Sequence, residues 1–135
     1  SELATAVGMG VKITVVITDN RGYGCINRLQ MGTGGAQFNN LYAHSNVSPI
    51  AIDFAAHAAS MGARSHKVSS ISELETALDA ARQATETTVI VIDTDPYPTT
   101  GAGGYWWDVA VPEVSARAEV NQARAAYEAA LKERT

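Results

Sequence analysis

Several residue types are scarce in this chain of 135 residues, and each scarcity excludes a class of protein. The single cysteine, Cys25, cannot form an internal disulfide, which agrees with a reducing cytoplasm. Only 10 Lys and Arg residues stand against 14 Asp and Glu, without a basic block, so nucleic acid is not an expected partner. No apolar run is long enough to span a bilayer, and we expect no membrane partner. The 46% of hydrophobic residues instead predicts a globular domain.

The N-terminal residues have the pattern of a βαβ unit whose first strand is not in the sequence. Residues 1–9 are typical of a helix that Gly10 would end, and the β-branched run 11–18 predicts a strand buried on both faces. A helix followed by a buried strand is half of a βαβ unit, whose first strand would have to precede Ser1. The chain also has neither an initiator Met nor a signal peptide. We therefore expect an N-terminally truncated fragment.

The remaining pattern alternates between helices and strands. Helices are expected over residues 53–61, with Asp53 as cap, over 72–81, with a capping box of Ser72 and Glu75, and over 116–132. Strands are expected over 63–68 and 87–94, a helical turn over 26–31, and irregular loops over 22–49 and 96–115. This order predicts an α/β fold with a doubly wound parallel sheet, and we assign residues 1–135 to one domain.

The run from Asp19 to Cys25, which directly follows the strand 11–18, is the strongest functional signal. In α/β proteins, ligands bind beyond the carboxyl ends of strands. Asn20 offers a side-chain oxygen, and Gly22 and Gly24 let the backbone approach a bound group, which suits a hard cation held with a phosphate. An ordinary turn is the alternative, because Asn and Gly both tolerate left-handed backbone conformations.

The run 15–42 resembles the diphosphate-binding domain of thiamine-diphosphate enzymes, in which a buried strand ends in Asn-x-Gly-Tyr. The resemblance implies that Asn20 and the carbonyl of Gly22 bind Mg²⁺, and that Tyr23, Gly24 and Cys25 help to bind thiamine diphosphate. The Gly-Asp-Gly motif of the family is not among the 19 residues that precede Asn20, and the family's activating glutamate lies in another domain. We therefore expect the isolated chain to be inactive.

Further stretches narrow the resemblance to one branch of the family. These are Cys25-Ile26-Asn27-Arg28, the pair Gly34-Gly35, residues 38–41 and residues 106–111. They are similar to the hydrolases that open a cyclic 1,2-dione in inositol catabolism. The resemblance implies a cyclic polyol dione as substrate, N-terminal domains of the same enzyme as partners, and a homo-oligomer. An acetolactate-synthase-like enzyme and a non-catalytic assembly module of the same fold are the alternatives.

Other polar and aromatic residues allow two interpretations each. Cys25 could be a nucleophile, or else a packing or site-wall residue. His57 and His66 are expected to be structural, whereas His44 could face substrate. Arg28, Gln30, Asn39 and Asn40 could bind a polyhydroxylated ring or simply belong to a polar loop. The aromatic cluster 105–107 could cover the site or anchor the last helix.

Overall fold

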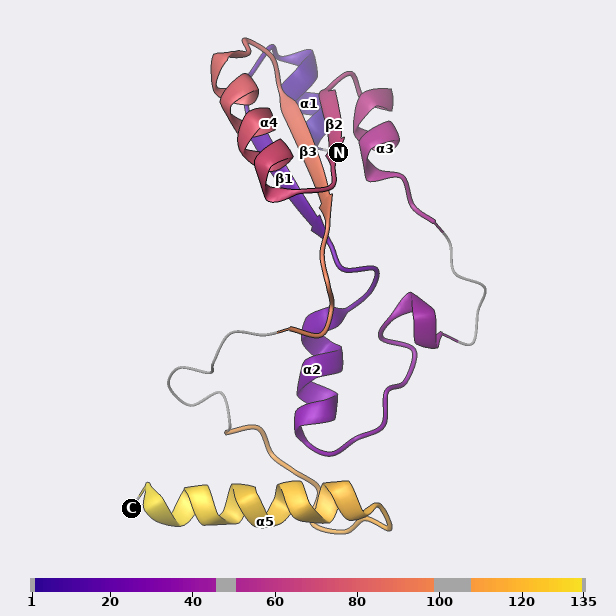
Figure 1. The fold of residues 1–135 in the computed structure, drawn as a ribbon, viewed down its shortest axis with the longest axis vertical. Helices are drawn as coiled ribbons and strands as arrows, with labels where there is room; N and C mark the ends of the chain where they lie inside the picture. The colour runs from indigo at the N-terminus through magenta and orange to yellow at the C-terminus, as the bar shows by residue number, and fades with distance from the viewer. Residues whose placement is uncertain (1, 46–50, 99–107, 135) are drawn as a thin grey trace. The chain divides into compact units, whose positions relative to one another are not determined.

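The computed structural model describes residues 2–45, 51–98 and 108–134, which fall into two compact units. Residues 1–20 and 50–95 form what we call the sheet unit, and residues 21–49 and 96–135 form the loop unit. Figure 1 shows the ribbon of both units. The assignment of all 135 residues to one domain stays a prediction.

The sheet unit contains a parallel three-stranded sheet in the order β1-β3-β2. Its strands are β1 (Thr14–Asp19), β2 (Arg64–Val68) and β3 (Thr88–Asp93), and Thr88 is in register with both Thr14 and Arg64. Parallel strands need crossover connections, which the helices between them provide. The predicted α/β class with a parallel sheet is confirmed.

Helices cover both faces of this sheet: α1 (Glu2–Gly8), α3 (Phe54–Ser60) and α4 (Ile71–Gln83). Figure 1 shows α4 on one side and α3 on the other. Ile90 and Ile92 of β3 pack on the side of α4, while Val89 and Val91 pack on the side of α1 and α3. Because successive strand residues point to opposite faces, the central strand is buried on both, as expected for a doubly wound sheet.

The expectation that the strand over residues 11–18, which corresponds to β1, is buried on both faces is wrong. Residues of β1 alternate between exposed and half-buried, and Val16 is 42% exposed. Val15 and Ile17 pack against the cluster beside α1 and α3, but the cluster beside α4 contains no β1 residue. β1 lies at the sheet edge and, within the described residues, pairs with β3 alone. Among the described residues, the face of β1 on the side of α4 therefore contributes no residue to a hydrophobic cluster.

Two predicted caps have different outcomes. Asp53 caps α3 as predicted, because its carboxylate accepts a hydrogen bond from the Ala56 amide at 2.9 Å. The capping box at Ser72 and Glu75 is wrong, because α4 is capped by Ser70, whose hydroxyl accepts from the Glu73 amide. The Glu73 carboxylate accepts from the amide and hydroxyl of Ser69, and these bonds, the amide bond first, lower the pKa of Glu73.

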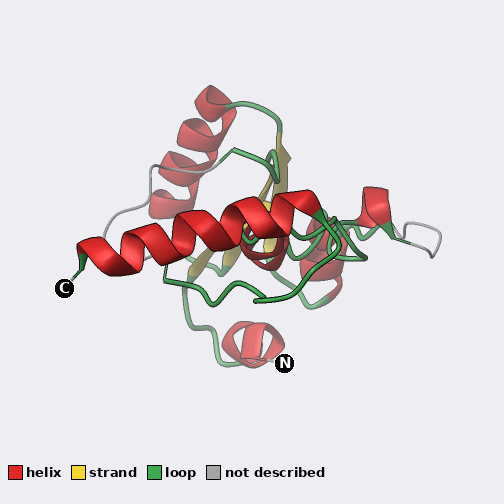
Figure 2. Cartoon of the chain, turned by 90° about the horizontal axis from the view of Figure 1, so that it is seen from below, coloured by secondary structure: helices red, strands yellow, loops and turns green. Residues whose placement is uncertain are grey.

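The loop unit contains α2 (Gly24–Gly32), the short 3₁₀-helix η1 (Tyr42–His44) and α5 (Ala118–Glu133). Figure 2 shows α5 as a long helix near the C-terminus. Arg124 donates to the Val111 carbonyl at 2.9 Å, and Arg117 donates to the Gly34 carbonyl at 2.8 Å. These bonds attach α5 to two loops of its own unit. Among the described residues, no helix combines the length and apolar character needed to cross a membrane.

Candidate cofactor site

The candidate site begins where β1 ends. The Asp19 carbonyl accepts a hydrogen bond from the Thr94 amide at 2.8 Å, and the half-buried Asn20 follows. Arg21 has a φ of 57°, a left-handed conformation that turns the chain sharply. The boundary between the units falls after Asn20, so Asn20 belongs to the sheet unit and Gly22 to the loop unit. Their joint binding of one cation stays a prediction.

Gly22 lies against the segment 40–42. An antiparallel bridge joins Gly22 to Leu41, flanked by hydrogen bonds from the Tyr23 amide to the Asn40 carbonyl (2.6 Å) and from the Tyr42 amide to the Arg21 carbonyl (3.0 Å). A Cβ atom at position 22 would overlap the Asn40 carbonyl oxygen and lie 2.8 Å from the Leu41 Cα. Glycine is therefore required here for close backbone approach.

The N-terminus of α2 follows this bridge directly. Gly24 is its first residue and is buried, and the N-cap Tyr23 makes no side-chain capping bond. The first-turn amides of a helix attract anions, because they lack intrahelical acceptors and carry the positive end of the helix dipole. Cys25 is exposed, so its interpretation as a packing residue is wrong, whereas a position in a site wall stays a prediction.

The predicted polar residues of the loop unit make several contacts within it. Gln30 accepts from the Asn40 side chain at 2.5 Å, and Arg28 donates to the Pro96 carbonyl at 3.4 Å. His44 Nε2 and the Tyr97 hydroxyl are 2.9 Å apart. Nothing in the sequence indicated a contact between residues 44 and 97, because it depends on how two distant loops meet.

The structure also singles out Asn27, which sequence reasoning used only as part of a motif. Asn27 is 1% exposed, and its Nδ2 donates to the Met31 sulfur at 3.3 Å. Its Oδ1 has no hydrogen-bond partner among the described residues. A buried acceptor without a donor costs about 1–3 kcal/mol.

The histidines form no metal site in the described part of the chain. His57 lies in α3 and His66 in β2, as expected. No three His, Cys, Asp or Glu residues gather closely enough to hold a metal ion among the residues that the structure describes. The aromatic cluster 105–107 lies outside the described residues.

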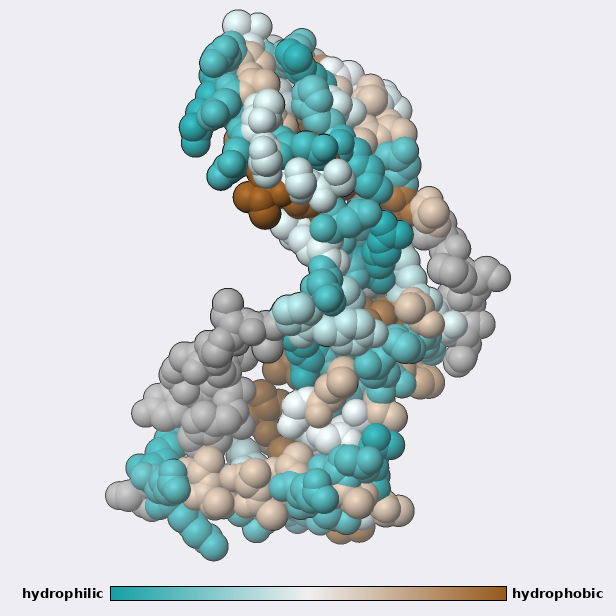
Figure 3. All heavy atoms as spheres, viewed as in Figure 1, coloured by the Kyte–Doolittle hydropathy of each residue, from teal (hydrophilic) through white to brown (hydrophobic). Residues whose placement is uncertain are grey.

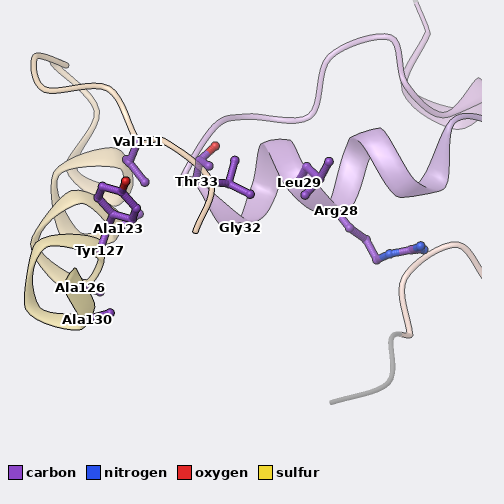
Figure 4. Close-up of a pocket in the computed structure, with 10 residues that line it drawn as sticks. Arg28, Leu29, Gly32, Thr33, Val111, Ala123, Ala126, Tyr127 and Ala130 are labelled. Atoms are coloured by element: carbon purple, nitrogen blue, oxygen red, sulfur yellow. The ribbon is translucent and has the colours of Figure 1, made fainter. Parts of the chain in front are cut away.

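A pocket of about 280 Å³ lies within the loop unit, between α2 and α5. Its walls are mostly apolar (Figure 4), with Leu29 and Val111 on opposite sides, and the Arg28 side chain extends away from the α5 wall. Brown, apolar atoms are visible above α5 in Figure 3. The lining contains no paired acid and base, so the pocket by itself indicates packing rather than catalysis.

Comparisons with known proteins identify the family of this chain. Residues 1–92 match the family described as thiamine pyrophosphate enzyme, C-terminal TPP binding domain. The chain is 40% identical over 124 residues to the 3D-(3,5/4)-trihydroxycyclohexane-1,2-dione hydrolase of Halalkalibacterium halodurans, covering 91% of this chain and 20% of that protein. It is also 37% identical to the protein of the same name from Listeria innocua, covering 98% of this chain and 21% of that protein.

A third relative is likewise much longer than this chain. A Bacillus cereus protein, 3D-(3,5/4)-trihydroxycyclohexane-1,2-dione hydrolase 2, is 39% identical over 135 residues, again covering 20% of its length. The chain thus spans about a fifth of the curated relatives it matches. Because the family match extends over more than half of the sequence, the chain belongs to the thiamine pyrophosphate enzymes, within their C-terminal TPP binding domain.

Proposed function

We propose that this chain is part of a hydrolase that uses thiamine diphosphate and Mg²⁺ to open trihydroxycyclohexane-1,2-dione, giving 5-deoxy-glucuronate in the degradation of myo-inositol. One observation supports this most directly: relatives bearing that activity in their names are 37–40% identical over at least 91% of this chain. The activity would belong to a longer, cytoplasmic and homo-oligomeric protein, whose other domains are the partners of this chain.

In this proposal, Asn20 contributes its side-chain oxygen and Gly22 its carbonyl oxygen to Mg²⁺. Both are hard oxygen donors of the kind that Mg²⁺ prefers, but both are uncharged. The close approach of residue 22 to residues 40 and 41 supports a defined carbonyl position, and the N-terminus of α2 supports the place of a diphosphate beside Tyr23, Gly24 and Cys25. The donor set therefore fits part of a site, to be completed by the diphosphate and by groups elsewhere in the protein.

Bound thiamine diphosphate supplies the carbon nucleophile for cleavage of a carbon–carbon bond. The residues of this chain would hold and orient the reacting groups. Arg28, Asn39 and His44 carry donors and acceptors suited to a polyhydroxylated ring, and we propose that at least one of them contacts it.

The test is expression of the complete reading frame that encodes this chain, assayed with the cyclic dione and with pyruvate. We expect turnover of the dione that depends on added Mg²⁺ and thiamine diphosphate. The variant Asn20→Ala removes a proposed direct ligand, so it should weaken Mg²⁺ binding by at least the roughly 10- to 100-fold that loss of an outer partner costs. The control Gln122→Ala changes an exposed residue of α5 and should leave binding unaltered.

Other outcomes identify the alternatives. Turnover of pyruvate instead of the dione would indicate an acetolactate-synthase-like enzyme. If the complete protein binds neither cofactor, a non-catalytic assembly module is correct. The 135-residue chain alone should bind Mg²⁺ and thiamine diphosphate only weakly in calorimetry, because two uncharged ligands hold Mg²⁺ poorly.

A further inference from the structure

The carbonyl of Gly22 is the proposed magnesium ligand, and a hydrogen bond to Asn40, across the bridge between Gly22 and Leu41, fixes the orientation of its peptide unit. The amide of Tyr23, which shares a peptide plane with the Gly22 carbonyl, donates to the Asn40 carbonyl at 2.6 Å. In a planar trans peptide the N–H and C=O groups point in opposite directions. The bond to Asn40 therefore directs the Gly22 oxygen away from residue 40.

Asn40 is in turn held by Gln30. The Asn40 amide nitrogen donates to Gln30 Oε1 at 2.5 Å, and Gln30 Nε2 donates to the Ala36 carbonyl at 2.5 Å. Because both ends of the Gln30 amide are engaged, its orientation is defined. The main-chain carbonyl of Gln30 also accepts from the Gly35 amide at 2.9 Å and from the Thr33 hydroxyl at 2.9 Å. Gln30 thus organises the chain between residues 33 and 40.

These contacts close a ring. Gln30 lies on α2, which begins directly after Tyr23, so the helix connects the site to Gln30 rigidly. The Asn40 side chain donates a hydrogen bond to Gln30, and the Asn40 carbonyl accepts one from the Tyr23 amide beside the site. Residues 23, 30 and 40 are thus linked to one another by α2 and these two bonds. A Cβ on Gly35 would lie 2.9 Å from the Gln30 carbonyl oxygen, so the turn after α2 has little room to rearrange.

We propose that Gln30 and Asn40 form an amide clamp that positions the Gly22 carbonyl for Mg²⁺, without either side chain touching the cation or substrate. This inference rests on the proposed function. Outer partners of metal ligands orient them, and their loss lowers metal affinity by about 10- to 100-fold. Loss of the clamp should therefore weaken cation binding, while saturating Mg²⁺ restores most of kcat.

The experiment uses the complete protein with Mg²⁺ as the probe, at saturating thiamine diphosphate. Gln30→Leu retains the side-chain size but removes both amide bonds, and Asn40→Ala removes the other half of the clamp. We expect each variant to bind Mg²⁺ about 10- to 100-fold more weakly. The double variant should be no weaker than Gln30→Leu, because the bond that Asn40→Ala removes is already absent in Gln30→Leu. Gln122→Leu on α5 is the matched control.

A second variant and a second measurement cover folding defects. Gln30→Glu retains the acceptor for Asn40 and loses the donor to Ala36, so its Mg²⁺ affinity should lie between those of the wild type and Gln30→Leu. Without cofactor, hydrogen exchange at the Tyr23 amide should be faster in Gln30→Leu than in the wild type.

Two Mg²⁺-binding results overturn the clamp and leave the proposed function intact. In one, the wild type binds Mg²⁺ and the variants bind equally well, even if their melting temperatures fall. In the other, the effects of the single substitutions add. If the wild type binds no Mg²⁺ with thiamine diphosphate, the proposed function fails and the clamp fails with it. Unchanged exchange at Tyr23 refutes the clamp alone.

Discussion

The substitution Gly22→Ala tests the close backbone contact on which the candidate site depends. The new methyl group would overlap the Asn40 carbonyl oxygen and lie 2.8 Å from the Leu41 Cα, both of which are backbone atoms that cannot rotate away. Separating the two segments costs the hydrogen bonds of Tyr23 and Tyr42, at about 0.5–1.5 kcal/mol each. Overpacking adds about 1–3 kcal/mol, so we expect a local destabilisation of about 2–6 kcal/mol.

Hydrogen–deuterium exchange reports this change at the residues concerned. A loss of about 2 kcal/mol corresponds to roughly 30-fold faster exchange, so the amides of Tyr23 and Tyr42 should lose protection by at least about that factor. Urea unfolding followed by circular dichroism gives the accompanying change in overall stability.

Gly32 provides the matched control. It ends α2, and a Cβ added there would meet no atom within 4 Å, so Gly32→Ala should raise stability by up to about 1 kcal/mol. If Gly22→Ala leaves exchange at Tyr23 and Tyr42 as slow as in the wild type, residues 21–23 and 40–42 are not held together by this bridge.

Two more predictions concern the sheet unit. The isolated chain should self-associate through the edge strand β1, and Val16→Lys should reduce this association, because a charge on an edge strand opposes pairing with another chain. Light scattering over a range of concentrations measures the association. Val114→Lys, at a position that is 91% exposed, is the control. Glu73 has a pKa below its ordinary value of 4.5 because the Ser69 amide and hydroxyl donate to it. The contribution of Glu73 to stability is therefore present above pH 4.5 and is lost as the pH falls through the lowered pKa. The melting temperature should fall less steeply with acidification in Glu73→Gln than in the wild type. An equally steep fall in both proteins contradicts the lowered pKa of Glu73.

Local signals in the sequence predicted much of the sheet unit. The apolar run 87–94 became the buried central strand, and Asp53 became a cap, because both depend on neighbouring residues. The second cap was placed two residues late, since serines precede glutamates at the same spacing twice, at Ser70–Glu73 and Ser72–Glu75. The sequence pattern alone could not distinguish them.

Burial of β1 was predicted wrongly for a different reason. A β-branched run indicates a strand, but the burial of each face depends on what packs against it. The cluster beside α4 includes residues of β2 and β3 and none of β1, a property of the assembled layers rather than of the residues 11–18. The Gln30–Asn40 contact was equally inaccessible, because it joins side chains across a folded loop.

By itself, the sequence determined that a β-branched strand ends before Asn-Arg-Gly-Tyr and that a helix follows, since strand and turn preferences act over a few residues. Only the tertiary structure decided that residues 40–42 return to bridge Gly22, and that the Asn40 side chain donates a hydrogen bond to Gln30. The physical reason is that hydrogen-bond partners distant in sequence are selected by loop closure and packing, which no local preference encodes.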